Sequence, residues 1–394
     1  MTLFPHSIRR AALACVVIAL VGTASCVGGN ETGAASKAGR VLILGLDGTR
    51  SELLELANMP NLNRLRATGF TDLDAITGDV SLSGPGWSSM MTGVWCDKHN
   101  VIDNDASWAN SQFNIFPHFM TRVEQIKPEL RTVSVSHWEP INEEILCADE
   151  RADNCGRVDK VVSKSTDAGV RDTVVDILNF ENPDVLFVQF DDIDHAGHGS
   201  EPYMTTAGGF CPRSTGSVDG ACTASGMNSE YIRAGQVTDG YIGDILTALY
   251  RRPNYNAENW LVIVSPDHGG AGTVQNQHGF NTAQERRTFF IVSGPRTAPL
   301  PGKPVTTLAG LPATTGNNVA PTDLTGAKIV DVAATALFHL RIPIDPKWGL
   351  EGQPVGLQGV PAYVEKTIPS CFNATSFSPD DRQPGDGNNG TPAP

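Results

Sequence analysis

Four short runs of apolar residues occur along the chain without the polar alternation of a half-exposed strand. They are Val41–Leu46, Val185–Phe190, Trp260–Val264 and Phe289–Val292. Runs rich in Val, Ile, Leu or Phe are typical of strands that are covered on both faces of a sheet. Helical patterns lie between them, notably Val170–Leu178 and Tyr231–Leu249. This alternation predicts an α/β fold, a three-layer sandwich with a largely parallel central sheet.

The two ends of the chain differ in composition from this part. Arg9 and Arg10 precede the uncharged run Ala11–Ser25, which is shorter than the roughly 20 apolar residues of a bilayer-spanning helix. Residues 1–25 are therefore expected to be a signal peptide. Residues 26–39 are rich in Gly, Ala and Ser, which predicts a flexible tether, and residues 376–394 have the composition of a disordered tail. One folded domain is expected over residues 40–375.

Cysteines support an exported protein. Cys26 closes the segment Thr23-Ala24-Ser25-Cys26, which resembles a bacterial lipobox with Thr in place of the usual Leu. Lipid on Cys26 would give a membrane-anchored protein, and ordinary cleavage would give a free periplasmic one. Without Cys15 and Cys26, six cysteines remain for three disulfides in an oxidising compartment. Proximity suggests the pairs Cys147–Cys155, Cys211–Cys222 and Cys96–Cys371, and other pairings stay open.

The charge balance narrows the classes of partner. The chain has 43 Asp and Glu residues against 29 Lys and Arg, a formal net charge of −14. It has no basic patch that could follow a phosphate backbone, so we expect no nucleic-acid-binding surface. The sequence leaves the oligomeric state open.

Acidic residues follow three of the four predicted strands. Asp47 follows the first, the group Asp191, Asp192 and Asp194 follows the second, and Asp267-His268 follows the third. A single Asp after a strand is usually a helix cap or a turn former. Sites in open α/β sheets form at the carboxyl ends of strands, so three such positions together predict a common site.

Histidines accompany these acidic residues. Asp194 and His198 are four residues apart, so one helical turn or a tight loop can direct both at one ion. Asp267 and His268 are adjacent, and His278 follows ten residues later. A lone His is more often structural than a ligand, but carboxylates combined with imidazoles suit zinc better than calcium or magnesium.

Several motifs carry a resemblance to a known family. In order along the chain they are Gly45-Leu-Asp-Gly-Thr-Arg50, Ser83-Gly-Pro-Gly-Trp-Ser-Ser-Met-Met-Thr-Gly93, Asp194-His-Ala-Gly-His198, Ser265-Pro-Asp-His-Gly269, His278-Gly-Phe-Asn281 and Trp348-Gly-Leu-Glu-Gly-Gln-Pro354. This set resembles the nucleotide pyrophosphatase/phosphodiesterase (type I phosphodiesterase) family of the alkaline phosphatase superfamily. The resemblance covers roughly residues 40–357 and implies that residues 40–375 form a single metallo-phosphoesterase catalytic domain.

The resemblance implies a role for each matching position. Asp194, His198 and His278 would hold one zinc ion, and Asp47, Asp267 and His268 a second. Ser83 falls at the nucleophile, which is usually Thr in the family, and would also touch the second ion. Asn104 falls where the family has an Asn that binds the phosphoryl oxygen, although Asn100 and Asp103 are close by. Serines in such a stretch, which also holds Ser81, Ser88 and Ser89, commonly cap a helix instead.

The implied activity is zinc-dependent hydrolysis of a small-molecule phosphodiester, such as a nucleotide pyrophosphate bond, through a phosphoseryl intermediate. One alternative is a phosphomonoesterase of the alkaline phosphatase type, which would need an additional Arg and a third metal ion at the site. The sequence identifies neither, although Arg50 or Lys98 could lie close to the site. Another alternative is a phosphonate hydrolase. A sulfatase is disfavoured because Trp87 stands where that family has Arg. A zinc-free binding protein is the non-catalytic alternative. The stretch Tyr203–Asn228 is expected to be a disulfide-pinned loop that selects the leaving group.

Overall fold

The computed structural model describes residues 39–147, 157–198, 229–270, 278–279, 281–295, 297 and 326–371. All of them belong to one unit, Lys37–Pro394. The predicted signal peptide, residues 26–38 of the predicted tether, the Tyr203–Asn228 loop and the tail 376–394 lie outside the described residues, whereas Gly39, the last residue of the predicted tether, begins the first strand. No helix in the described part is both long enough and apolar enough to cross a bilayer.

A seven-stranded sheet forms the centre of this unit, in the order β2-β7-β6-β1-β5-β3-β4. The strands are β1 Gly39–Leu46, β2 Phe70–Ile76, β3 Thr132–Ser136, β4 Lys160–Ser163, β5 Val185–Phe190, β6 Asn259–Ser265 and β7 Arg287–Ser293. β1 pairs in parallel with β5 and β6, and β3 pairs in parallel with β4 and β5. Only β7 is antiparallel to its neighbours β2 and β6. The predicted, largely parallel sheet is therefore confirmed.

The four apolar runs all form strands. β5 has the predicted bounds, and every one of its residues is buried. β1, β6 and β7 extend one or two residues beyond the predicted runs. β3 was not anticipated because serine alternates with valine in it, yet it is buried throughout. The Ser134 hydroxyl donates to Asn142 Oδ1 at 2.8 Å, which satisfies one of these buried hydroxyls.

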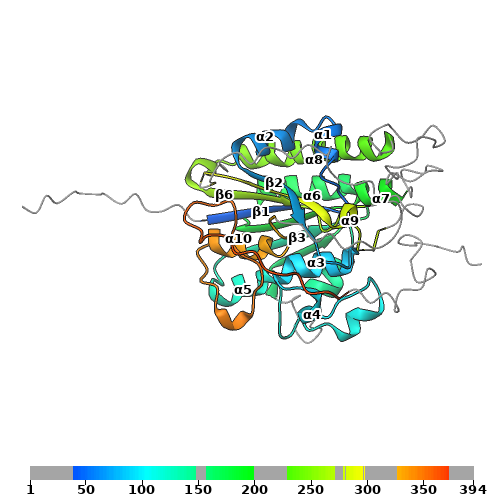
Figure 1. The fold of residues 1–394 in the computed structure, drawn as a ribbon. Coiled ribbons are helices and arrows are strands. Elements are labelled where there is room, and N and C mark those ends of the chain that lie inside the picture. Colours follow the sequence, from blue (N-terminus) through cyan, green and yellow to red (C-terminus); the bar gives the residue numbers. More distant parts are fainter. Residues whose placement is uncertain are drawn as a thin grey trace, which may run out of the picture. The chain divides into compact units, whose positions relative to one another are not determined.

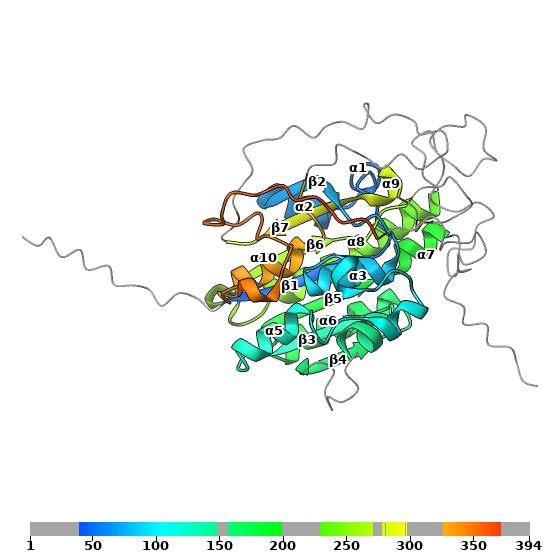
Figure 2. The same cartoon turned by 60° about the horizontal axis from the view of Figure 1, so that its bottom comes forward.

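Helices cover both faces of the sheet (Figures 1 and 2). On one face lie α1 Leu53–Leu56, α2 Pro60–Thr68, α6 Asp167–Phe180 and α8 Ser229–Tyr250. On the other lie α3 Ser83–Thr92, α4 Cys96–His99, α5 Phe119–Ile126 and α10 Asp331–His339. The short helices α7 Asp192–His198 and α9 Ala283–Arg286 lie at one end of the sheet. The three layers agree with the prediction, and α6 and α8 contain both predicted helices.

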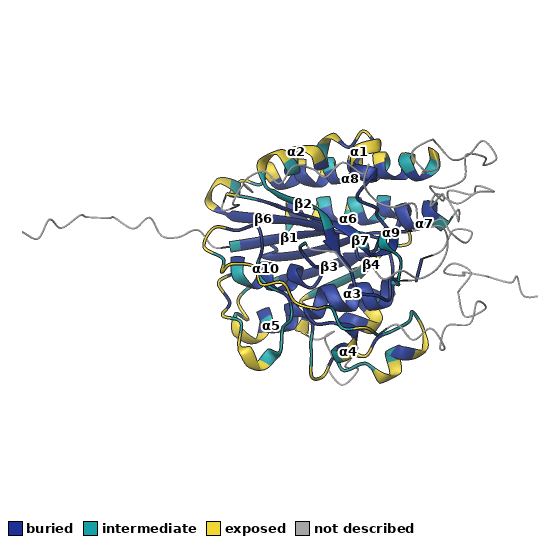
Figure 3. Cartoon of the chain, viewed as in Figure 1, coloured by how far each residue is buried: buried dark blue, intermediate teal, exposed yellow. Residues whose placement is uncertain are grey.

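Alternate residues of β1 divide the apolar interior into two cores. Leu42 and Leu44 pack with α2, α6 and α8, whereas Val41 and Ile43 pack with α3, α5 and α10. This is the period-two alternation of a strand that is buried on both faces. Figure 3 shows the buried sheet between helices whose outer faces are exposed. The two cores fix the strands, and thereby their carboxyl ends.

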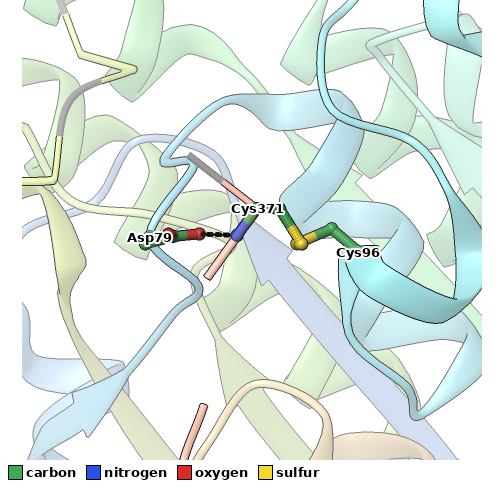
Figure 4. Close-up of side chains that lie close together, drawn as sticks. All are labelled: Asp79, Cys96 and Cys371. Carbon is green, nitrogen blue, oxygen red and sulfur yellow. Dashed lines mark hydrogen bonds between the residues drawn. A yellow bond between two sulfur atoms is a disulfide. The ribbon is translucent and has the colours of Figure 1, made fainter. Parts of the chain in front are cut away.

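A disulfide joins Cys96 at the start of α4 to Cys371, as predicted. Figure 4 shows Asp79 beside it, where Oδ1 of Asp79 accepts a hydrogen bond of 3.0 Å from the Cys371 amide. Cys147 is also disulfide-bonded. Its predicted partner Cys155 and the predicted pair Cys211–Cys222 lie outside the described residues. The Cys96–Cys371 bond ties the last described segment to the chain that follows α3.

Candidate metal centre

The acidic residues predicted from the strand ends converge at one edge of the sheet. Asp47 directly follows β1, Asp267 and His268 follow β6, and α7 follows β5. Gly48 allows the close approach of β1 to α7, since its φ is +56° and a Cβ on it would lie 2.1 Å from Asp194 Oδ1. Parallel strands with helical crossovers thus bring groups more than 200 residues apart into one site.

Asp47, Asp267 and His268 form what we call the strand-end group. One ligand atom from each lies within 4.8 Å of the others. The Nε2 atom of His268 is 3.5 Å from Asp47 Oδ1 and 3.3 Å from Asp267 Oδ2. Oδ1 of Asp267 accepts a hydrogen bond of 3.3 Å from the Gly48 amide. These three side chains are essentially inaccessible to solvent.

Two residues that the sequence reasoning missed hold Asp47. The Trp87 indole donates to Asp47 Oδ2 at 2.8 Å, and the Gln189 amide donates to the same oxygen at 3.1 Å. Gln189 is the one polar residue in the otherwise apolar strand β5 and is fully buried. A polar residue within an apolar run was therefore the sequence signal that could have identified Gln189, because a buried amide needs hydrogen-bond partners. Together the two donors fix one carboxylate oxygen and turn the other towards His268.

Asp194, His198 and His278 form the second group, which we call the helix group. His198 Nε2 lies 3.0 Å from Asp194 Oδ2 and 3.0 Å from His278 Nε2, and His278 Nε2 lies 3.7 Å from Asp194 Oδ1. Asp194 and His198 are on one turn of α7, which is the first of the two arrangements that their spacing allows. The His268 and His278 rings stack with centroids 3.8 Å apart, so the two groups adjoin.

Backbone carbonyls orient two of the imidazoles. His268 Nδ1 lies 2.7 Å from the Gly269 carbonyl oxygen, and His278 Nδ1 lies 2.6 Å from that of Ser81. A carbonyl only accepts hydrogen bonds, so each Nδ1 carries a proton and each Nε2 is the ring nitrogen that faces the carboxylates. A histidine held through one ring nitrogen in this way is the usual arrangement for binding a metal through the other. Ser81 was not identified from the sequence in this supporting role.

Ser83 is the one serine of its segment whose hydroxyl contacts the strand-end group. Its Oγ lies 3.5 Å from Asp47 Oδ1 and 3.3 Å from His268 Nε2. Ser83 is the first residue of α3, where backbone N–H groups and the helix dipole favour an anion. Ser81 instead donates to Glu285, and Ser89 contacts His99. The serine that the resemblance implies as nucleophile is thus the one beside the carboxylates.

Asn104 lies next to the nucleophile position. Its Oδ1 accepts a hydrogen bond of 2.7 Å from the Gly84 amide, while its Nδ2 makes no hydrogen bond within the described ranges. Asp103 instead accepts from the backbone and hydroxyl of Ser107 in its own loop. The side chain of Asn100 donates to the Asn110 carbonyl. Of these three side chains, that of Asn104 is the one that is hydrogen-bonded to the start of α3.

The charges of the site call for a cation. Burial, together with the nearby Asp267, Asp191 and Asp194, raises the pKa of Asp47 well above its usual range. Burial likewise raises the pKa of Asp267 to about 7. Burial also opposes ionisation of Asp194, but His198 and His278 more than offset it and lower the pKa of that carboxyl. Several carboxylates therefore share a buried space that favours added positive charge.

The donor atoms fit a transition-metal ion. Oδ1 of Asp194 and Oδ2 of Asp267 are buried and accept no hydrogen bond within the described residues. Buried acceptors of this kind call for a partner. One ligand atom each from Asp194, His268 and His278 also lies within 4.8 Å of the others, so His268 belongs to both halves of the site. Mixed carboxylate and imidazole donors match zinc.

Comparison with known proteins relates part of the chain to one family. Residues 41–125 match the family model described as type I phosphodiesterase / nucleotide pyrophosphatase. The chain resembles that family, as its motifs predict. The match includes Asp47, Ser83 and Asn104, and it ends before the other ligands of the centre. No curated protein matches the chain.

Solved structures show the fold. The chain is similar to BT1596, a 2-O GAG sulfatase, with a TM-score of 0.56 and 16% identity over 81% of this chain and 73% of that one. It is similar to BT4656, solved with its substrate D-glucosamine-2-N,6-O-disulfate, with a TM-score of 0.52 and 13% identity over 84% and 83%. For murine ectonucleotide pyrophosphatase/phosphodiesterase 5 the TM-score is 0.49, with 11% identity over 78% and 96%. The first two structures support an alkaline-phosphatase-like fold, and at these identities the likeness concerns the fold alone.

Proposed function

We propose that this chain is an exported hydrolase that cleaves small-molecule phosphodiesters, such as nucleotide pyrophosphates, with Ser83 as nucleophile and two Zn²⁺ ions as cofactors. The observation that carries the proposal is Ser83 Oγ, which lies within 3.5 Å of both Asp47 Oδ1 and His268 Nε2 at the start of α3. The match of residues 41–125 to the phosphodiesterase family supports the choice of reaction.

The strand-end group would hold one ion together with Ser83, and the helix group would hold the other. When bound, the ions would favour the Ser83 alkoxide and neutralise charge on the attacking and leaving oxygens. Ser83 Oγ then bonds to phosphorus as the bond from phosphorus to the leaving oxygen breaks. Water hydrolyses the phosphoseryl ester in the second half of the reaction, which frees Ser83.

The protein's own donors would orient the phosphoryl group. Asn104 Nδ2 is available to donate to a non-bridging oxygen, because its Oδ1 is held by the Gly84 amide. The N-terminus of α3 adds a favourable dipole on the same side. Donors fixed before the reaction stabilise charge that develops in the transition state.

The contacts of Arg50, Lys98 and Trp87 help to choose among a phosphate diester, a phosphate monoester and a sulfate ester as the substrate. Arg50 binds Glu52, with Nη2 3.1 Å from Oε1, and Lys98 binds Glu351 at 3.1 Å and the Gly349 carbonyl at 2.9 Å. Neither cation is therefore placed to take the additional charge of a monoester. The Trp87 indole, which stands where sulfatases have Arg, is buried and donates to Asp47. These contacts favour a diester over a phosphate monoester or a sulfate ester.

The location also belongs to the proposal. Residues 1–25 are expected to direct export as a cleaved signal peptide, with or without lipid on Cys26. The Cys96–Cys371 disulfide supports an oxidising compartment, since such bonds are rare in the cytosol. Fractionation of cells that express the full chain, with Cys26→Ser as the variant, tests the anchor. Release of the variant from the membrane fraction is the expected result.

Hydrolysis of three p-nitrophenyl probes tests the activity. The zinc-loaded protein is expected to prefer the phosphate diester over the phosphate monoester and the sulfate. Ser83→Ala removes the attacking oxygen, so turnover should fall by about a thousandfold or more while the zinc content is unchanged. Ser88→Ala is the matched control, because Ser88 is in the same helix but is not part of the centre. Full activity of Ser83→Ala would reject the mechanism, and preference for the monoester or sulfate would reject the substrate class.

A further inference from the structure

A second set of histidines and carboxylates lies behind the centre described above. His137 directly follows β3, and Asp167 is the first residue of α6. Asp191 directly follows β5, and Asp192 and His195 lie in the first half of α7. The set consists of His137, Asp167, Asp191, Asp192 and His195, and we call it the β3–β5 cluster. The proposed reaction uses none of these five side chains.

Three members of the β3–β5 cluster have the geometry of a metal site. One donor atom each from His137, Asp191 and His195 lies within 4.8 Å of the others. His195 Nε2 is 3.0 Å from Asp191 Oδ2, and the two imidazole rings meet edge to face with centroids 5.3 Å apart. Ligands at ordinary zinc distances in a tetrahedral site are about 3.4 Å from one another. Only small shifts would bring these donors onto one ion.

Supporting hydrogen bonds orient two of these ligands. Asp167 Oδ1 lies 2.8 Å from His137 Nδ1, so this ring donates its Nδ1 proton to a carboxylate and leaves Nε2 as the atom that could bind an ion. A carboxylate behind an imidazole is the usual second partner of a zinc-binding histidine. The Gln189 amide donates to Asp191 Oδ1 at 3.1 Å and leaves Oδ2 on the side of His195.

The charges of the cluster also favour a cation. Asp167 is fully buried, Asp191 is 4% exposed and Asp192 is 9% exposed. Within the described residues, the ion pairs of these three carboxylates are all with His137 and His195, and none is with Lys or Arg. The Asp192 carboxylate accepts no hydrogen bond there, and its nearest ion-pair contact is His137 Nδ1 at 3.8 Å. Buried carboxylates in excess over cations are costly unless a positive charge joins them.

We propose that His137, Asp191 and His195 bind a further divalent transition-metal ion, best matched by Zn²⁺, with water at the fourth position. Two imidazoles and one carboxylate form a mixed donor set that suits zinc and not calcium or magnesium. This site is separate from both the strand-end group and the helix group, and the inference goes beyond the proposed hydrolysis.

The further ion would act on the catalytic centre through Gln189. The amide nitrogen of Gln189 donates to Asp191 Oδ1 and to Asp47 Oδ2, both at 3.1 Å, while its oxygen accepts from the backbone amides of His137 and Trp138. An ion that fixes Asp191 thus fixes the amide that orients Asp47. The role of the site would be to position a ligand of the strand-end group.

Zinc stoichiometry tests the inference on the full-length protein. The protein is loaded with Zn²⁺ and dialysed, and zinc per chain is measured by mass spectrometry. We expect three ions in the wild type and two in His195→Gln. Asp172→Asn changes an exposed carboxylate on α6 and should keep three. Equal zinc in the wild type and His195→Gln would overturn the site.

A second pair of measurements separates this site from the proposed function. Asp267→Asn should lose zinc from the strand-end group and keep the ion that His195→Gln loses. If only His195→Gln loses zinc, the further site stands and the proposed centre fails. If only Asp267→Asn loses zinc, the proposed centre stands and the further site fails.

Anomalous scattering at the zinc edge from wild-type crystals does not depend on the folding of a variant. A peak among His137, Asp191 and His195 is expected there, and its absence overturns the proposal.

Discussion

The strand-end group and the helix group are equal in ligand number but differ in how the protein holds them. Asp47 and Asp267 follow adjacent strands, and each accepts hydrogen bonds from other parts of the fold. In the helix group, the Ser81 carbonyl holds His278, but His198 lies on the short helix α7 and has a side chain that is 22% exposed. The sheet therefore builds one half of the centre in advance, whereas the other half includes a partly exposed ligand on a short helix.

This difference indicates which half of the centre a metal ion would order more when it binds. A preformed site loses little conformational freedom on binding, and a looser one must be ordered by the ion. We expect the strand-end group to bind zinc more tightly and to retain it longer. The helix group would exchange its ion more readily.

The largest expected effect follows from changing a ligand of the preformed half. Asp267→Asn replaces a fully buried carboxylate by a neutral amide of the same shape, so charge is lost where no water can replace it. Zinc affinity at the tighter site should fall by about a thousandfold, more than for an outer partner of a ligand. Competition with a chromogenic chelator measures this change. Asp244→Asn, at an exposed carboxylate on α8, is the control, and a change below tenfold in Asp267→Asn would contradict the comparison.

A smaller effect is expected in the other half. His198→Gln removes a partly exposed imidazole from the helix group, where water can take the vacant position. Zinc affinity at the weaker site should fall by about a hundredfold, with the loss mainly in faster release. Stopped-flow mixing of the loaded protein with excess chelator gives the release rates. A loss equal to that of Asp267→Asn would show that the sheet does not distinguish the two halves.

The smallest effect concerns helix α3, which carries Ser83 beside the strand-end group, and is measured as the change of folding stability with pH. α3 begins at Ser83, and its Ser89 contacts the buried His99 at 2.9 Å. Burial lowers the pKa of His99 to about 3, against 6.5 for the exposed side chain. The native state therefore stays unprotonated where the unfolded chain takes up a proton, and stability is lost as pH falls from about 6.5 towards 3.

For this one group the loss between pH 7 and pH 5 amounts to about 2 kcal/mol. Urea unfolding of the zinc-loaded wild type and of His99→Gln at both pH values measures it. The wild type should lose about 2 kcal/mol more than the variant on going to pH 5. His118, whose pKa burial lowers to about 4, remains in both proteins and cancels in the difference. Identical pH dependence would mean that His99 is protonated in the fold.

The sequence was sufficient for the parts of the fold in which a strand is built around an apolar run. β5 was predicted with its bounds, and β1, β6 and β7 to within two residues. β2, β3 and β4 were missed because they mix polar and apolar residues. The polar side chains of β3 are satisfied by distant partners, as Ser134 is by Asn142. Such partners are set by tertiary packing, which local patterns do not record.

The same limit applies to the centre. The spacing and motifs identified Asp47, Asp194 and Asp267 together with their histidines, and the structure brings all of these side chains together. The roles assigned to them stay predictions. Gln189, Trp87 and Ser81 were not foreseen, because each acts by a hydrogen bond to a residue far away in the chain. The β3–β5 cluster was missed for a similar reason, since β3, which precedes His137, was not predicted.

The Cys96–Cys371 bond has a topological consequence. It closes a covalent ring between two cysteines that are 275 residues apart in the sequence. The ring includes α6, α7 and α8 together with Asp194, Asp267 and their histidines, whereas Asp47 and Ser83 precede it. One peptide bond cut anywhere inside this ring opens the circle but releases no fragment. A nicked molecule would therefore run as a single full-mass species on a denaturing gel until a reductant is added. In an extracellular setting rich in proteases, such a chain can be cleaved once and still keep both halves of its centre joined.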